Sequence, residues 1–281
     1  MEEQRVQKFI AKSGYCSRRR AEIFIEKEAV TVNGKTISLG EKCLPTDKIM
    51  VNDDLIEFDL NDNVYYVLNK QYGFVTTNSD EFGRRTVFDS ITDKDNKDNL
   101  FSVGRLDKDT EGLLILTNDG DFAQKIIHPS QSIIKEYIVT INKELTNKDK
   151  TTIEKGIILD DRKLVPCTIK HTINNKYSVK ISEGRRRQIR RMFEEFGYKI
   201  YGLKRIKIGN MDLKELNIQI GKYKKYKKEE LENMIFSKHK QKKKQHQRLQ
   251  PKKIYENKKN YKNNNYNKRK SGEPKTINPK N

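Results

Sequence analysis

The chain has 281 residues, of which 34% are hydrophobic, and its mean hydropathy of -0.93 is low for a single compact core. It carries 59 Lys and Arg against 39 Asp and Glu residues, a formal net charge of +20. The N-terminus lacks a signal-peptide apolar region, no apolar run approaches the ~20 residues that span a bilayer, and three cysteines are too few for a disulfide framework. We therefore expect a soluble, cytoplasmic protein and exclude the membrane-spanning and disulfide-stabilised classes.

Residues 5–58 have the pattern of a small module of two helices and a hairpin. Apolar residues recur at helical spacing from Val6, and a second helix is expected to start after Ser17, a residue type that caps helices. Further along, two short strand-like segments flank Asn33-Gly34, a pair typical of tight hairpin turns. The sequence thus predicts a small α/β domain over residues 1–60.

Three consecutive arginines, Arg18, Arg19 and Arg20, open the second helix of this module. Positive charge at a helix N-terminus is unfavourable for the helix dipole, so phosphate binding offers a reason for it, with a plain solvated face as the alternative. The segment from Ser17 to Glu22, followed by Val30-Thr31-Val32-Asn33-Gly34, resembles the S4 RNA-binding domain. That resemblance favours the reading of these arginines as RNA-binding residues.

Residues 63–221 alternate strand-like and helix-like segments and predict an α+β domain with a mixed, mainly antiparallel sheet. The expected strands are 64–68, 113–116, 135–141, 164–170, 177–181 and 200–208, and the expected helices are 121–128, 147–155 and 185–196. The last helix presents an apolar stripe that includes Ile189 and Phe193, while Arg187, Arg190 and Arg191 share another face. It can pack against a core and still offer guanidinium groups.

The segment from Gly104 to Gly120 places Asp107 in an acidic, glycine-closed turn that an apolar strand, Leu113–Leu116, can hold in place. Three interpretations compete on these residues alone. The aspartates could simply shape a turn, or they could form a calcium loop, although its twelfth position is Asn118 and not a bidentate carboxylate. The third, a phosphatase with an aspartyl nucleophile, requires Thr or Val where Glu111 stands.

At full length, the segment closely resembles the signature of the pseudouridine synthases, in the branch of the bacterial small-subunit rRNA enzyme. Four more motifs follow the expected order, and together they cover residues 5 to about 221, with Gln71 standing where the family usually has a proline. These motifs are Asn69-Lys70-Gln71-Tyr72-Gly73, Lys135-Glu136-Tyr137, Glu183 to Phe193, and Leu203 to Gly209.

The resemblance implies that a uridine in RNA is detached from C1′ of its ribose, turned and reattached through C5. A carboxylate nucleophile and proton acceptors suffice for this isomerisation, so no cofactor and no metal are expected. Asp107 would be the nucleophile, Tyr137 would stack on the target base, and Arg190 would be the counter-ion that keeps Asp107 ionised. The base must be unpaired or extruded to be reached.

The remaining candidates are RNA-binding arginines and the partners that they imply. Arg105, Arg185, Arg187 and Arg191 are expected to contact RNA, with a surface role for Arg105 as the alternative. The partner is ribosomal RNA or a ribosomal precursor, more in the manner of family members that modify large-subunit rRNA, and we expect a monomer. A non-catalytic RNA-binding assembly factor with the same fold is the alternative function.

Residues 222–281 hold 21 Lys and Arg against 5 Asp and Glu, which is +16 of the net charge and leaves +4 for the rest of the chain. Lysine clusters and the run Asn263-Asn264-Asn265 predict a basic tail that is disordered after about residue 237. Such a tail would strengthen RNA binding in a salt-dependent way. Accumulation of Lys and Asn in a low-GC genome is the alternative explanation, above all for the asparagines.

Overall fold

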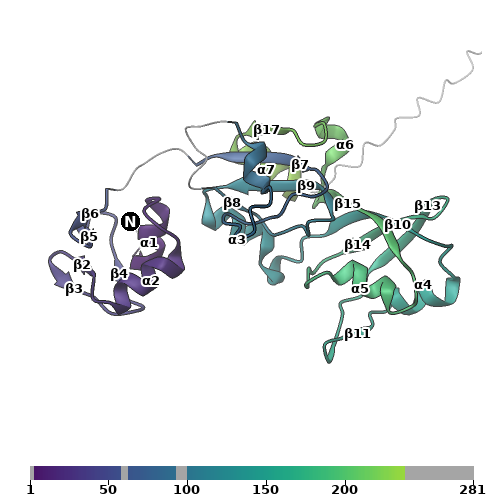
Figure 1. Ribbon diagram of the computed structural model, residues 1–281, viewed down its shortest axis with the longest axis horizontal. Helices are drawn as coiled ribbons and strands as arrows, with labels where there is room; N and C mark the ends of the chain where they lie inside the picture. Colours follow the sequence, from purple (N-terminus) through teal and green to yellow (C-terminus); the bar gives the residue numbers. More distant parts are fainter. Residues whose placement is uncertain (1–2, 58–62, 93–99, 238–281) are drawn as a thin grey trace, which may run out of the picture. The chain divides into compact units, whose positions relative to one another are not determined.

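The computed structural model describes residues 3–57, 63–92 and 100–237 of the chain (Figure 1). The N-terminal module contains an antiparallel sheet in the order β3-β2-β5-β6 and a separate pair formed by β1 and β4. Its elements are β1 (Gln4–Arg5), α1 (Val6–Lys12), α2 (Arg18–Glu26), β2 (Val30–Val32), β3 (Lys35–Thr36), β4 (Lys42–Cys43), β5 (Ile49–Val51) and β6 (Asp54–Leu55).

Local signals account for this module. The Ser17 hydroxyl accepts a hydrogen bond from the backbone N–H of Arg20, so Ser17 caps α2 as predicted. Asn33 and Gly34 have φ values of 53° and 79°, the left-handed conformation that the tight turn between β2 and β3 requires. Val6, Ile10 and other apolar side chains of both helices pack on the sheet to form a separate core.

The second domain is built on one nine-stranded sheet with the central order β13-β14-β10-β15-β9-β7-β17, and all its pairings except β9 with β15 are antiparallel. This arrangement confirms the predicted α+β class. The elements are β7 (Tyr65–Lys70), η1 (Val87–Ser90), β8 (Phe101–Ser102), β9 (Glu111–Thr117), α3 (Gly120–Ile127), η3 (Pro129–Gln131), β10 (Lys135–Ile141), α4 (Asn147–Glu154), β11 (Ile158–Leu159), β12 (Arg162–Lys163), β13 (Thr168–Ile173), β14 (Lys176–Ile181), α5 (Gln188–Glu194), β15 (Ile200–Ile208), β16 (Met211–Asp212), α6 (Leu213–Leu216), β17 (Tyr223–Tyr226) and α7 (Lys228–Phe236).

The apolar run of β9 is continuous because both faces of the strand are buried. Leu113 and Ile115 pack into a cluster with side chains of α3 and α7, whereas Leu114 and Leu116 belong to a second cluster on the other face. The second cluster also includes apolar side chains of α5, which lies near β10 and β14 in the other half of the sheet (Figure 1). A strand supported on both sides is a rigid base for the turn that precedes it.

The two halves of the sheet are joined through a short parallel contact between β9 and β15. Only two residue pairs form it, Glu111 with Lys204 and Gly112 with Arg205. A Cβ atom at Gly112 would lie 2.1 Å from the Arg205 carbonyl oxygen, and the φ of Gly112 is 104°, so only glycine fits this approach. The glycine that closes the 104–112 motif therefore serves the junction of the sheet.

Three expected boundaries are wrong. The domain continues past residue 221, because β17 pairs with β7, and Leu231 and Ile235 of α7 are buried in the core. The last predicted helix begins at Gln188 and not at 185, since Arg187 adopts the left-handed conformation with φ 50°, and the strand expected from 164 begins at Thr168. The predicted disorder of 238–281 lies outside the described residues, and within those residues no helix is long and apolar enough to cross a membrane.

Candidate active site

A cleft of about 820 Å³ opens beside the junction of β9 and β15. Asp107 and Arg105 line it, and so does the segment from Gly184 to Ile189, which includes Arg186 and Arg187. The remaining lining residues come from the 76–79 segment, from β8 and the start of the 104–110 segment, from Ile127, and from Tyr137, Ile181 and Leu203 on strands of the sheet. Residues far apart in the sequence thus converge on Asp107.

The backbone of residues 107–110, the 107–110 turn, is fixed by hydrogen bonds to its carbonyl groups. The Thr110 N–H donates to the Asp107 carbonyl oxygen at 3.0 Å. The Lys70 ammonium donates to the carbonyl oxygens of Thr110 at 2.7 Å and Lys108 at 3.3 Å, and the Gly73 N–H also donates to that of Lys108 at 2.9 Å. The turn is therefore held by the end of β7 and the segment that follows it.

Lys70 is a site residue to which the sequence assigned no role. Its side chain is 1% exposed at the end of β7, and burial lowers its pKa to about 8, against the opposing effect of Asp109, Glu111 and Asp107. Three backbone carbonyls, including that of Gln71, surround the ammonium. The sequence did contain a signal for a buried lysine, because Lys70 of the Asn69-Lys70 motif directly continues an apolar strand.

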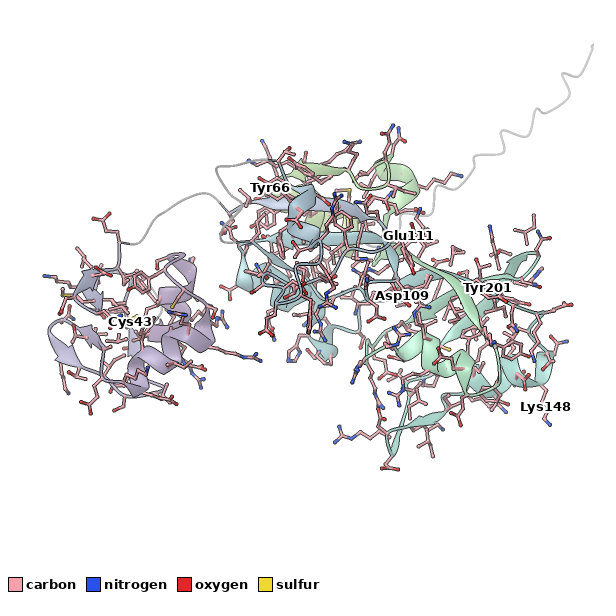
Figure 2. All side chains as sticks on the ribbon, in the orientation of Figure 1. Cys43, Tyr66, Asp109, Glu111, Lys148 and Tyr201 are labelled. Carbon is pink, nitrogen blue, oxygen red and sulfur yellow. The ribbon has the colours of Figure 1, made fainter. Side chains whose placement is uncertain are left out.

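The ion pair of Arg190 differs from the prediction. Its guanidinium lies 3.1 Å from the Asp109 carboxylate and donates to the Asp109 carbonyl oxygen at 2.8 Å, and Arg187 approaches the same carboxylate at 3.5 Å. Among the described residues no ion pair joins Asp107 to a basic side chain. The prediction of an Asp107–Arg190 ion pair is therefore wrong for this structure, because Arg190 forms its ion pair with Asp109 instead. Figure 2 shows Asp109 and Glu111 near the centre of this domain.

This arrangement also bears on the calcium-loop alternative. The carboxylate of Asp109, which would have been its second ligand, faces two guanidinium groups that repel a cation. In the described part of the chain, no group of three or more His, Cys, Asp or Glu side chains could hold a metal ion.

Thr76 fixes the backbone just before Asp107. Its hydroxyl donates to the Leu106 carbonyl oxygen at 2.7 Å and accepts from the Leu106 N–H at 3.4 Å. The turn is thus anchored from both sides while the half-buried Asp107 side chain lines the cleft. Preorganisation of this kind lets a reactive group act without first being ordered.

Tyr137 lies on β10, is 8% exposed and lines the same cleft as Asp107. Its neighbour across the strand pair is Arg205, which is 4% exposed and donates to the Leu113 carbonyl oxygen at 2.7 Å. An aromatic ring and a carboxylate therefore share one cavity. A planar base can stack on the Tyr137 ring while the Asp107 carboxylate reaches the nucleoside to which the base belongs.

The predicted RNA-binding arginines fall into two groups. Arg105 and Arg187 are exposed at the cleft, and Arg18, Arg19 and Arg20 are exposed on α2. In contrast, Arg185 donates to the carbonyl oxygens of Leu159, Arg162 and Lys163 around the β11–β12 hairpin, and Arg191 forms a bidentate pair with Asp160 at 2.7 Å. The guanidinium groups of Arg185 and Arg191 are thus engaged within the protein, whereas Arg187 combines its exposed position at the cleft with the longer contact to Asp109.

A cleft that presents one fixed carboxylate beside an aromatic ring and several arginines, in a chain whose separate N-terminal module exposes three consecutive arginines on α2, defines an enzyme that acts on a polyanion with planar bases. Comparisons with known proteins agree. The RNA pseudouridylate synthase profile matches residues 64–195, and the S4 domain profile matches residues 4–49.

The chain belongs to the RNA pseudouridine synthase family. It is 38% identical to ribosomal large subunit pseudouridine synthase B of Bacillus subtilis, over 76% of this chain and 89% of the relative, and 38% identical to dual-specificity RNA pseudouridine synthase RluF of Escherichia coli K12, over 74% and 71%. A solved pseudouridylate synthase crystal structure superposes with a TM-score of 0.61 at 31% identity, covering 82% of this chain and 99% of that one. These findings confirm the predicted family and S4 domain and favour the enzyme over the non-catalytic assembly factor.

Proposed function

We propose that the protein converts one or more uridines of ribosomal RNA, with large-subunit rRNA as the main substrate, to pseudouridine. Support comes from the names of its relatives, among them large-subunit enzymes of Bacillus subtilis and Yersinia pestis, the latter 34% identical over 69% of its length. The S4 domain, with exposed arginines on α2, supplies a surface suited to RNA phosphates. The enzyme works as a monomer in the cytoplasm, where its substrate is made.

The observation that carries the proposed chemistry is the 107–110 turn, whose backbone is anchored while Asp107 lines a cleft that arginines also line. The Asp107 carboxylate bonds covalently to the nucleoside, the bond between C1′ and N1 breaks, and the base turns. A bond between C1′ and C5 then forms as the carboxylate is released, the C5 proton passes to solvent, and N1 takes up a proton in its place, so that the product is an isomer of the substrate. Tyr137 stacks on the base during the exchange.

Arg190 and Asp109 have positioning roles in this proposal. Arg190 holds the turn through the carbonyl and carboxylate oxygens of Asp109. Arg105, Arg186 and Arg187 remain at the cleft to meet phosphates of the bound strand.

The test is to map pseudouridines in both rRNAs and in small RNAs from cells with and without the gene. At least one large-subunit pseudouridine should be lost without it and restored by the wild-type gene, but not by an Asp107→Asn gene. The inclusion of small RNAs addresses a second substrate, since RluF is named a dual-specificity enzyme. Unchanged rRNA in the deleted strain would contradict the proposal.

A further inference from the structure

The loop of residues 76–85 holds an exposed aromatic ring beside the cleft. Phe82 is 79% exposed, which is unfavourable for an apolar side chain unless a partner covers it. Thr76 to Ser79 of the same loop line the cleft, and three residues of chain reach at most about 11 Å, so the ring lies close to the cleft rim. Neither the fold nor the proposed chemistry uses this side chain.

The ring is held in a defined position by a charged support. The Arg84 guanidinium lies over it, with Cζ 4.9 Å from the ring centroid. Asp80, whose side chain is 4% exposed, accepts hydrogen bonds from the Arg84 side chain at 2.9 Å and from its backbone N–H at 2.6 Å. Since this carboxylate already holds the guanidinium, Arg84 supports one face of the Phe82 ring and leaves the rest of it open.

Hydrogen bonds also connect this loop to the backbone beside the 107–110 turn. The Thr76 hydroxyl bonds to the backbone of Leu106, next to Asp107, and the Asn78 amide donates to the Leu100 carbonyl oxygen. The Val75 N–H and the Arg85 carbonyl close the base of the loop with a hydrogen bond of 2.9 Å. The exposed ring therefore has a fixed relation to the nucleophile.

We propose that Phe82, supported by Arg84 and Asp80, is a stacking platform for a base of the RNA strand next to the target uridine. This inference rests on the proposed function. Extrusion of a uridine leaves its neighbours without a stacking partner, and an aromatic ring beside the cleft offsets that cost without reading the sequence. The platform thus adds affinity for the strand around the target and takes no part in bond exchange.

The test uses the full-length protein and unmodified large-subunit rRNA transcribed in vitro. Binding is measured directly, and turnover is measured as tritium released from [5-³H]uridine-labelled RNA, since the C5 hydrogen is lost. Phe82→Ala should weaken binding about tenfold, within the range for loss of one base stack, with kcat at saturating RNA within about twofold. Phe82→Trp should restore binding, and Arg84→Ala should give an intermediate loss.

The matched control is Ile173→Ala, which removes another exposed apolar side chain (63%). Ile173 lies at the β13–β14 hairpin, at the opposite end of β14 from the cleft residue Ile181, and its loss should leave binding unchanged. Wild-type turnover together with undiminished binding by Phe82→Ala, or failure of Phe82→Trp to restore binding, would overturn the platform alone. A wild-type protein that does not modify this RNA would overturn the proposed function and the platform together.

Discussion

At the scale of single residues, the carbonyl groups of four consecutive residues, 107–110, each accept a hydrogen bond from another part of the chain or from the turn itself. The Asp107 carboxylate differs from this backbone because it lines the cleft and forms no ion pair among the described residues. A fixed backbone together with a carboxylate that forms no ion pair holds a nucleophile in position and leaves its oxygens available to a substrate.

Asp107→Asn should abolish turnover and preserve RNA binding. The amide has nearly the same size as the carboxylate but is not a nucleophile, so tritium release should fall at least about 10³-fold, equivalent to about 4 kcal/mol. Affinity for rRNA and the thermal midpoint should stay close to the wild-type values, which serve as controls for folding. Turnover within tenfold of wild type would remove Asp107 from the proposed role.

Asp109→Asn should lower kcat about tenfold with a smaller change in RNA affinity. Arg190 is 6% exposed, and loss of its partner leaves a buried charge that no longer holds the turn firmly. The matched control is Asp160→Asn, which removes the exposed partner of the adjacent Arg191 and should change kcat by less than twofold. Equal effects of the two variants would argue against a positioning role for Asp109.

Lys70 should give the stability of the protein a distinctive pH dependence. Burial lowers its folded-state pKa to about 8 from an ordinary 10.5, so above pH 8 the folded chain releases a proton that the unfolded chain still holds. The sign is therefore positive: relative to Lys70→Met, the wild type should gain about 1 kcal/mol of unfolding free energy between pH 7.5 and 9. Urea titrations measure this difference. Parallel pH curves for the two proteins would contradict the shifted pKa.

At the scale of elements, β17 and α7 complete the domain beyond the expected boundary at 221. β17 covers the edge of β7, with Tyr223 edge-on to Tyr66 at 5.3 Å, and α7 buries Leu231 and Ile235. Burial of the two aliphatic side chains alone contributes roughly 3–6 kcal/mol, a large part of the ~5–15 kcal/mol that stabilises a domain.

A chain that ends after residue 221 should therefore be unstable, whereas one that ends after residue 237 should unfold at the temperature of the full-length protein. The comparison requires only the two truncations and a thermal melt followed by circular dichroism. Both lose the basic tail, so any difference between them belongs to β17 and α7. Equal midpoints would show that these two elements are dispensable for the fold.

The sequence predicted the elements whose causes are local. The apolar run that became β9, the cap at Ser17 and the Asn33-Gly34 turn each carry their own signal. β17 was missed because its residues, Tyr-Lys-Lys-Tyr, read as part of a basic tail, and only pairing with β7 makes them a strand.

The site residues likewise divide into those with a signal in the local sequence and those that depend on tertiary contacts. Asp107 and Tyr137 stand in motifs that the family resemblance covers, and the structure brings both to one cleft. The partner of Arg190 depends on which of two nearby carboxylates the folded turn directs toward α5, and no sequence spacing decides that. The burial of Lys70 likewise depends on tertiary contacts made by carbonyls about 40 residues away.

At the scale of the whole molecule, charge is distributed very unevenly along the chain. Residues 238–281 contain 16 Lys and Arg against 2 Asp and Glu, a net charge of +14 out of +20 for the protein. Cationic side chains near RNA release counterions, and for single-stranded RNA each phosphate contact contributes about 0.7 to the salt dependence of the binding constant. The tail should therefore contribute affinity of a kind that does not depend on sequence.

Removal of residues 238–281 should weaken RNA binding at low salt and flatten the plot of log Kd against log salt concentration. Five lost phosphate contacts would reduce the slope by about 3.5, whereas kcat at saturating RNA should not change because the described site lies within residues 70–205. The control is a tail of equal length in which Lys and Arg are replaced by Gln, which should behave like the truncation if charge is the cause. An unchanged slope in both proteins would instead support composition bias as the origin of the lysines.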